Sequence, residues 1–179
     1  IHAYSPLGKE LDSLSDLVSF GLAPAFLVMN AMIDAGAPLG LSFIALFIAL
    51  MGALRLAKFN VDTRQATSFI GLPIPANALF WIGTMGWISE HGYPGDIVMA
   101  VLIIGVSLLM VSELKMFSLK FKDMAFKGNV RRYTVLAACV FFIATDGVAG
   151  FAWTIILYIL ISLLGKRTDP DNFEDGLQA

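Results

Sequence analysis

Charged residues are scarce in this chain: Asp, Glu, Lys and Arg make up 15% of its 179 residues, whereas hydrophobic residues make up 58%. A typical soluble domain carries about 25% charged and about 45–50% apolar residues. The composition therefore excludes an ordinary soluble globular domain, and the mean hydropathy of +0.78 agrees with this. The net charge of −2 says little about partners, and we expect no nucleic acid to bind.

Cysteine is almost absent, since Cys139 is the single one, and it lies in an apolar run. This excludes an internal disulfide and the cysteine-rich frameworks of small secreted domains. No Cys and His residues cluster at zinc-ligand spacing. The sequence also starts without an initiator methionine or a signal peptide, so we interpret it as part of a longer chain.

Long apolar stretches are abundant. A membrane-spanning helix needs about 20 mostly apolar residues, and a short stretch can borrow its ends from the interface. Periodicity alone does not separate such helices from buried soluble ones, but six in succession with short linkers predict an all-α, polytopic transmembrane helix bundle. We expect one transmembrane domain over 1–165 and a polar cytoplasmic tail over 166–179. The six expected spans are roughly 12–33, 38–57, 73–90, 96–114, 132–146 and 148–165.

Basic residues fall on one side of this arrangement. The connections at 34–38, 90–96 and 146–147 contain no Lys or Arg, so all twelve lie on the opposite side. By the positive-inside rule, that side is cytoplasmic, together with both ends of the chain. Between 115 and 132, basic residues alternate with Met and Phe. This pattern predicts an amphipathic segment against anionic headgroups.

A glycine and two carboxylates stand at the cytoplasmic start of the first span. Gly8, Asp12 and Asp16 are spaced four residues apart, so on a helix they share one face, with the two acids about 6 Å apart along the axis. Carboxylates at a membrane segment usually mark function, and a pair on one face suits a hard cation such as Mg²⁺. The alternative is that both acids are merely interfacial, with Lys9 screening their charge.

The spacing Gly8-x3-Asp12-x3-Asp16 resembles the second half of the signature of CDP-alcohol phosphotransferases, D-x2-D-G-x2-A-R-x8-G-x3-D-x3-D. The stretch 5–24 and the pair 55–61 and 69–75 are similar to the bacterial membrane-embedded members of this family that make phosphatidylserine. The first half of the signature would precede Ile1. By this resemblance the chain lacks part of the metal-binding motif, and we expect it to be inactive on its own.

The resemblance implies phospholipid biosynthesis in the bacterial inner membrane, with the active site facing the cytoplasm. A phosphatidyl group would pass from CDP-diacylglycerol to the hydroxyl of L-serine, with CMP released and Mg²⁺ or Mn²⁺ as cofactor. It implies that Asp12 is a metal ligand and that Asp16 is both a metal ligand and the general base. Gly8 and Lys9 would contact the nucleotide and its diphosphate. Membrane lipids are further expected partners, and family members commonly form homodimers.

The carboxylate of a serine acceptor needs a cation. Arg55 and Lys58 lie at the cytoplasmic end of the second span, level with the two acids, and Asn60 follows. Arg55 is the better candidate because a guanidinium can hold a carboxylate through two parallel hydrogen bonds. The alternative is that Arg55 and Lys58 only determine topology.

Two other functions stay open. A close alternative keeps the chemistry but changes the acceptor alcohol to glycerol phosphate or inositol phosphate, which would need extra cations for its own phosphate. A different class is a cation-coupled transporter that uses Asp12 and Asp16 as a relay.

Overall fold

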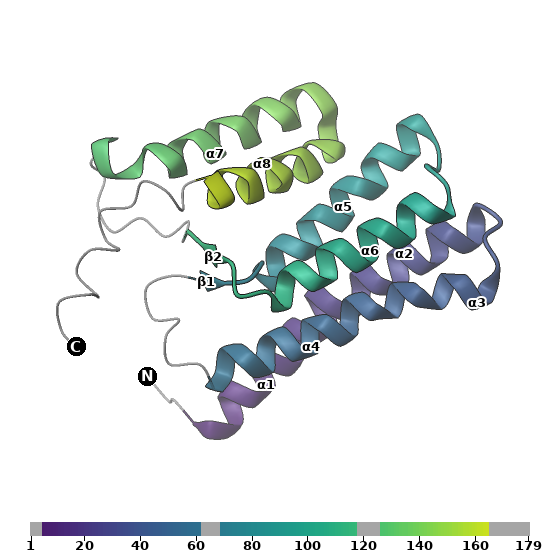
Figure 1. The fold of residues 1–179 in the computed structure, drawn as a ribbon, viewed down its shortest axis with the longest axis horizontal. Helices are drawn as coiled ribbons and strands as arrows, with labels where there is room; N and C mark the ends of the chain where they lie inside the picture. Colours follow the sequence, from purple (N-terminus) through teal and green to yellow (C-terminus); the bar gives the residue numbers. More distant parts are fainter. Residues whose placement is uncertain (1–4, 62–68, 118–125, 165–179) are drawn as a thin grey trace.

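The computed structural model describes residues 5–61, 69–117 and 126–164, which form a bundle of roughly antiparallel helices (Figure 1). The chain opens with two long helical stretches, here called the first two helical lines, and each contains a short turn that is not α-helical. The first comprises α1 (Pro6–Asp16), η1 (Leu17–Leu22) and α2 (Ala23–Asp34), and the second comprises α3 (Leu39–Ser42), η2 (Phe43–Ala45) and α4 (Leu46–Val61). The remaining helical elements are α5 (Ile74–His91), α6 (Asp96–Val111), α7 (Phe126–Asp146), η4 (Gly147–Ala149) and α8 (Gly150–Leu164).

The helix ends follow from local chemistry. The Ser5 side chain accepts a hydrogen bond from the Gly8 amide at 3.0 Å, and Pro6 follows as the first helical residue. A serine cap followed by proline is a strong helix start, because proline has no amide proton to leave unpaired. At the other end of the bundle, Gly36 and Gly92 adopt positive φ angles of 87° and 88°. Such backbone conformations favour glycine and let the chain reverse between helices.

Helices occupy all six stretches in which the sequence predicted spans. Three described helices are long and apolar enough to cross a membrane, namely Leu7–Asp34, Leu39–Val61 and Asn129–Leu164. The last is 36 residues long and folds back at η4, so that α7 and α8 lie side by side (Figure 1). The all-α class is confirmed and the long apolar helices indicate a membrane protein, whereas the number of six spans stays a prediction. The expected tail over 166–179 lies outside the described residues.

The outward face of the bundle is apolar. Large hydrophobic side chains are exposed along the helices, with Leu50, Val101, Leu108 and Val140 each at least half exposed. A soluble monomer rarely exposes large contiguous apolar surface. This face is therefore suited to contact lipid.

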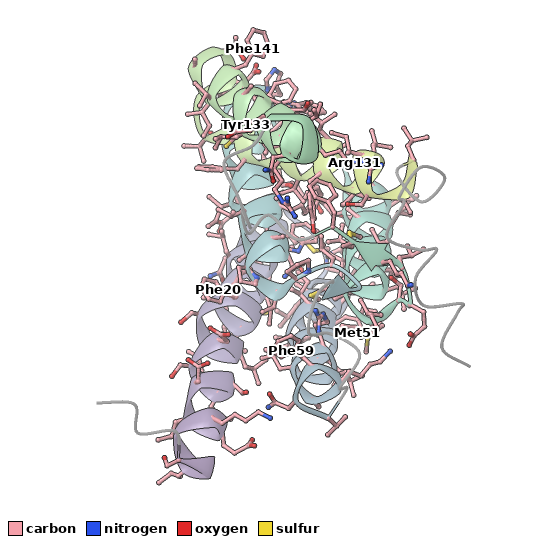
Figure 2. The ribbon with its side chains drawn as sticks, turned by 90° about the vertical axis from the view of Figure 1, so that its left-hand side faces the viewer. Phe20, Met51, Phe59, Arg131, Tyr133 and Phe141 are labelled. Carbon is pink, nitrogen blue, oxygen red and sulfur yellow. The ribbon has the colours of Figure 1, made fainter. Side chains whose placement is uncertain are left out.

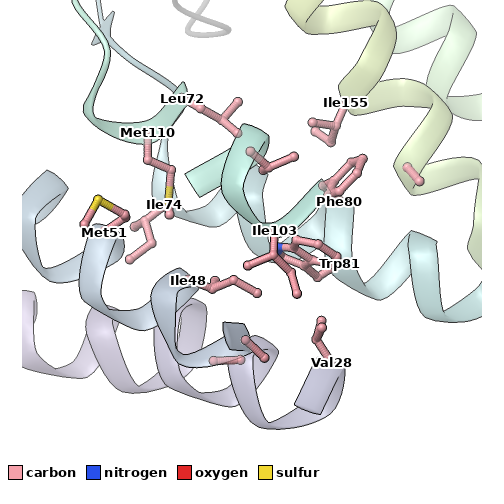
Figure 3. Close-up of a cluster of buried hydrophobic side chains, with 14 of the residues drawn as sticks. Val28, Ile48, Met51, Leu72, Ile74, Phe80, Trp81, Ile103, Met110 and Ile155 are labelled. Atoms are coloured by element: carbon pink, nitrogen blue, oxygen red, sulfur yellow. The ribbon is translucent and has the colours of Figure 1, made fainter. Parts of the chain in front are cut away.

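The core is built where α2, α4, α5 and α6 meet, and it extends to α7 and α8 (Figure 3). Trp81 is fully buried at its centre, between Val28 of α2, Ile48 of α4 and Ile103 of α6. The Trp81 ring meets Phe80 edge-on, with 5.1 Å between the ring centroids. This packing anchors α5 against the first two helical lines, which carry the candidate site.

Small residues allow helix backbones to touch at two places. A Cβ on Gly83 of α5 would lie 2.1 Å from the Ala152 amide nitrogen of α8, and one on Gly52 of α4 would lie 3.7 Å from the Gly21 Cα. Close approach through glycine and alanine is a typical way for membrane helices to associate. These contacts hold α5 against α8 and η1 against α4.

A two-residue strand pair joins the ends of two helices. Strand β1 (Phe69–Ile70) pairs antiparallel with β2 (Lys115–Met116). The Gly71 amide then donates to the Leu114 carbonyl at 2.8 Å. Gly71 has a φ of +78°, and a Cβ there would lie 2.3 Å from the Met110 carbonyl oxygen. Only glycine fits, so this pairing holds the start of α5 against the end of α6.

Candidate functional site

The two expected acids lie on one stripe of α1, as their spacing predicted. Asp12 is exposed and Asp16 is half-buried, and their charges are close enough to interact. Gly8 continues the stripe one turn earlier, where a Cβ would meet only the Ser5 hydroxyl, at 3.1 Å. The open backbone at Gly8 leaves room for a bulky group to approach beside the two carboxylates.

The neighbouring stripe of α1 is fastened to α4. The Asn60 side-chain amide donates to the Ser13 hydroxyl at 2.9 Å, and the Lys9 ammonium donates to the Asn60 carbonyl at 3.0 Å. Together with the Gly21–Gly52 approach further along, these contacts make the two helices run antiparallel. Asp16 therefore lies level with the last two turns of α4, as the sequence predicted.

A π-helical turn, η1, follows Asp16 directly. It ends just before Pro24, which has no amide proton for the carbonyl four residues earlier, that of Phe20. The Asn77 side-chain amide of α5 donates to this Phe20 carbonyl at 3.4 Å. Asn77 is itself fully buried and accepts a hydrogen bond from the Trp81 indole at 3.0 Å. A side chain from another helix thus replaces the donor that Pro24 removes.

This arrangement connects the core to the candidate site. π-helical turns are rare and often occur at functional sites. Here one lies between α1 and α2 and sets the direction of α1 relative to α2. The sequence reasoning missed Asn77. Its signal was present, because it is the only side-chain amide between 73 and 90, and polar groups inside membrane segments are costly and usually have a role.

The three residues expected to hold the acceptor have three different environments. Arg55 is only 4% exposed, and its guanidinium lies 5.5 Å from the centroid of the Phe59 ring. It also interacts electrostatically with Tyr158 of α8, so it is directed into the bundle. Lys58 donates to the carbonyl of Val111, the last residue of α6, at 3.1 Å, and it forms an ion pair at 2.7 Å with Glu113, which lies just beyond that helix.

Asn60 directly contacts α1. The sequence placed Arg55, Lys58 and Asn60 at one level, and α4 does so. The sequence alone does not show in which directions the three side chains point, because these directions depend on which helices surround α4.

The acids fit part of a divalent-cation site. Among residues 5–61, 69–117 and 126–164, no three His, Cys, Asp or Glu side chains gather to form a complete protein-built site. Mg²⁺ is usually bound through one or two carboxylates, while water and substrate phosphates supply the other ligands. Asp12 and Asp16 provide two carboxylates of this kind on one helix face.

The sequence is similar to known proteins over its first two thirds. The model of the CDP-alcohol phosphatidyltransferase family matches residues 1–112, which end just after α6. A CDP-diacylglycerol–serine O-phosphatidyltransferase of Methanocaldococcus jannaschii is 41% identical over 111 residues, covering 62% of this chain and 50% of the relative.

Two further relatives agree. The archaetidylserine synthase of Methanothermobacter thermautotrophicus is 39% identical over 119 residues, 64% of this chain and 46% of its own. A CDP-diacylglycerol–serine O-phosphatidyltransferase of Bacillus subtilis is 36% identical over 115 residues, 64% of this chain and 61% of its own. The chain thus spans about half the length of the curated relatives it matches, and α7 and α8 lie outside the family match.

Proposed function

Because the chain belongs to the CDP-alcohol phosphatidyltransferase family, we propose that it transfers a phosphatidyl group from CDP-diacylglycerol to the hydroxyl of L-serine and releases CMP. The observation that carries this proposal is the Gly8–Asp12–Asp16 stripe, which opens the first apolar helix within the matched region. The names of all three relatives above contain serine. This favours serine over glycerol phosphate or inositol phosphate.

The reaction needs charge neutralisation and a base. Asp12 and Asp16 would hold one Mg²⁺ or Mn²⁺, which supplies charge neutralisation on the diphosphate when bound. Asp16 accepts the proton of the serine hydroxyl as the new serine O–P bond forms and the P–O bond to CMP breaks. Such transfer depends mainly on positioning and electrostatics, and the contacts of α1 with α4 provide the positioning.

Gly8 and Lys9 would receive the nucleotide. The backbone at Gly8 is open toward the stripe, so the diphosphate can approach α1 closely. The Lys9 ammonium uses one donor on the Asn60 carbonyl. An ammonium has three donors, and we assign the phosphate to those that point away from α4.

The serine carboxylate is assigned to Arg55, with Asn60 and Lys58 as neighbours that shape the acceptor site. Replacing Arg55 with Ala in the full-length protein is expected to raise the KM for serine by about tenfold or more, because a charge-assisted hydrogen bond contributes about 1.5–3 kcal/mol. Lys58→Ala is the matched control and is expected to change the KM less, since Lys58 is paired with Glu113.

Thermal unfolding of Arg55→Ala must be measured alongside, because Arg55 is buried. Arg55→Lys keeps the charge without the planar fork and is expected to restore only part of the serine affinity. An unchanged serine KM in a folded Arg55→Ala variant rejects the assignment.

The proposed setting is the bacterial inner membrane, with α5, α6, α7 and α8 as separate spans beside the first two helical lines, which gives six spans within the domain 1–165. The basic connections would face the cytoplasm, as would the Asp12–Asp16 stripe and the tail over 166–179. A homodimer is proposed only because members of this family commonly form homodimers.

A product assay with the full-length protein tests the function. CDP-diacylglycerol and Mg²⁺ or Mn²⁺ are supplied with L-serine, glycerol phosphate or inositol phosphate in turn, and CMP is measured. We expect CMP only with serine, and none after the metal is chelated. CMP with a different alcohol would move the chain to another branch of the family, and no CMP with any alcohol would favour a cation-coupled transporter.

A further inference from the structure

A mostly apolar cavity of about 390 Å³ lies between α5, α7 and α8. Ligand pockets commonly have volumes of about 300–1,000 Å³. Arg132 is the single charged residue among those that line it. The Thr154 hydroxyl donates to the Gly150 carbonyl at 2.7 Å and the Tyr158 hydroxyl to the Phe117 carbonyl at 2.9 Å. Both hydroxyls are thus hydrogen-bonded to backbone carbonyls, so the polar character of the cavity is concentrated at Arg132.

The charge and the apolar walls are arranged along the helix axes. Arg132 lies in the second turn of α7, near the end where Pro73 precedes α5. Cys139 and Phe151 line the cavity further toward the opposite end of the bundle. Seven residues separate Arg132 from Cys139, which corresponds to about 10 Å of helix. A cavity with one charged end and apolar walls complements a phosphate followed by an acyl chain.

The surroundings of Arg132 favour an anionic headgroup. Arg132 donates a hydrogen bond to the Asn129 side chain, and Asn129 is almost fully buried, so the guanidinium is held in place at this end of the cavity. Residues 115–132 contain six basic residues and one acidic residue. Basic clusters beside a membrane helix attract anionic lipids by about 1 kcal/mol per charge near the surface.

We propose that this cavity binds an anionic phospholipid of the bilayer, with one acyl chain between α5, α7 and α8 and the phosphate at Arg132. The lipid is distinct from the transferred one, because the cavity is built without α1 and α4 and because α7 lies at the opposite end of the molecule from α1 (Figure 2). Two of its three walls, α7 and α8, also lie outside the family match over residues 1–112.

Cys139 allows a direct test, because it lines the cavity and is the only cysteine in this sequence. The full-length protein is stripped of lipid in detergent, and the rate at which N-ethylmaleimide modifies Cys139 is followed by peptide mass spectrometry. Phosphatidylglycerol or phosphatidylcholine is then added. Both lipids carry a phosphate, but the quaternary ammonium of phosphatidylcholine offsets its charge, whereas phosphatidylglycerol keeps a net negative charge at Arg132. We therefore expect half-protection of Cys139 at about tenfold less phosphatidylglycerol than phosphatidylcholine.

Two neighbouring residues provide matched variants. Arg132→Gln is expected to abolish the difference between the two lipids, whereas Arg131→Gln, one residue earlier and not in the cavity wall, should retain it. By native mass spectrometry, Cys139→Trp should lose the bound phosphatidylglycerol. Val140→Trp should keep it, because Val140 is 65% exposed and points elsewhere. Thermal unfolding confirms that each variant is folded.

Equal protection by both lipids, or an unchanged preference in folded Arg132→Gln, overturns the proposal. Protection that rises with protein concentration without lipid would assign the cavity to a second copy of the chain, and protection by CDP-diacylglycerol alone would assign it to the substrate. Either result also overturns it. None of these measurements uses transferase activity, so their failure leaves the proposed function untouched.

Discussion

Replacing Asp16 with Asn is expected to lower the rate of CMP release from CDP-diacylglycerol and serine by about 10²–10⁴-fold, the usual contribution of a general base. Asparagine has nearly the same shape and keeps the helix, but it accepts no proton and binds a hard cation poorly. Asp16 lies at the end of α1, half-buried and directly before the π-helical turn. Its loss should therefore affect the chemistry without displacing the helix.

Asp12→Asn should behave differently, because it removes a metal ligand and not the base. We expect its activity to recover in part at higher Mn²⁺ concentration, whereas that of Asp16→Asn does not. Glu10→Gln is the matched control, since Glu10 is also exposed on α1 but lies about 200° around the helix from Asp12. Asp16→Asn with activity close to that of the unmodified protein, or equal losses in all three variants, would contradict the assignment.

Gly83→Ala is expected to cause a large loss of stability for the addition of a single methyl group. Its Cβ would lie 2.1 Å from the Ala152 nitrogen and 2.9 Å from the Ala152 Cα. These are backbone atoms of α8, so relief requires the two helices to separate. Overpacking costs about 1–3 kcal/mol and occasionally more, and we expect the free energy of unfolding to fall by about 3 kcal/mol.

Gly105→Ala on α6 is the control, because a Cβ there meets no atom within 4 Å. Alanine in a helix is about 0.5–1 kcal/mol more favourable than glycine, so this variant should be equally stable or slightly more stable. Unfolding in mixed micelles, followed by circular dichroism, measures both. A Gly83→Ala protein as stable as Gly105→Ala would show that α5 and α8 do not touch at this position.

Much of the fold could be predicted from the sequence, because hydropathy and turn residues act locally. The six apolar stretches contain helices, and Pro6, Gly36 and Gly92 lie at the helix ends where their backbone preferences place them. The Asp12–Asp16 stripe followed from spacing alone. Such features need no knowledge of neighbouring elements.

The rest depends on tertiary contacts. Pro24 removes a backbone donor from the first helix, but the donor that compensates for it, Asn77, comes from a helix more than fifty residues later. Likewise, α4 directs Arg55 into the bundle and Lys58 toward Glu113. These directions are decided by which helices pack against α4, and a single sequence does not contain that information.

We propose that Asp12 and Asp16 together hold a divalent cation on the face of α1 that receives CDP-diacylglycerol. Anomalous scattering from Mn²⁺ in crystals of the full-length protein with CDP-diacylglycerol tests it most directly. We expect a Mn²⁺ peak about 2–2.2 Å from carboxylate oxygens of both residues, close to the spacing at which hard cations of this size bind oxygen, with the diphosphate beside it. A peak elsewhere, or two carboxylates turned apart into lipid with no metal between them, would contradict it.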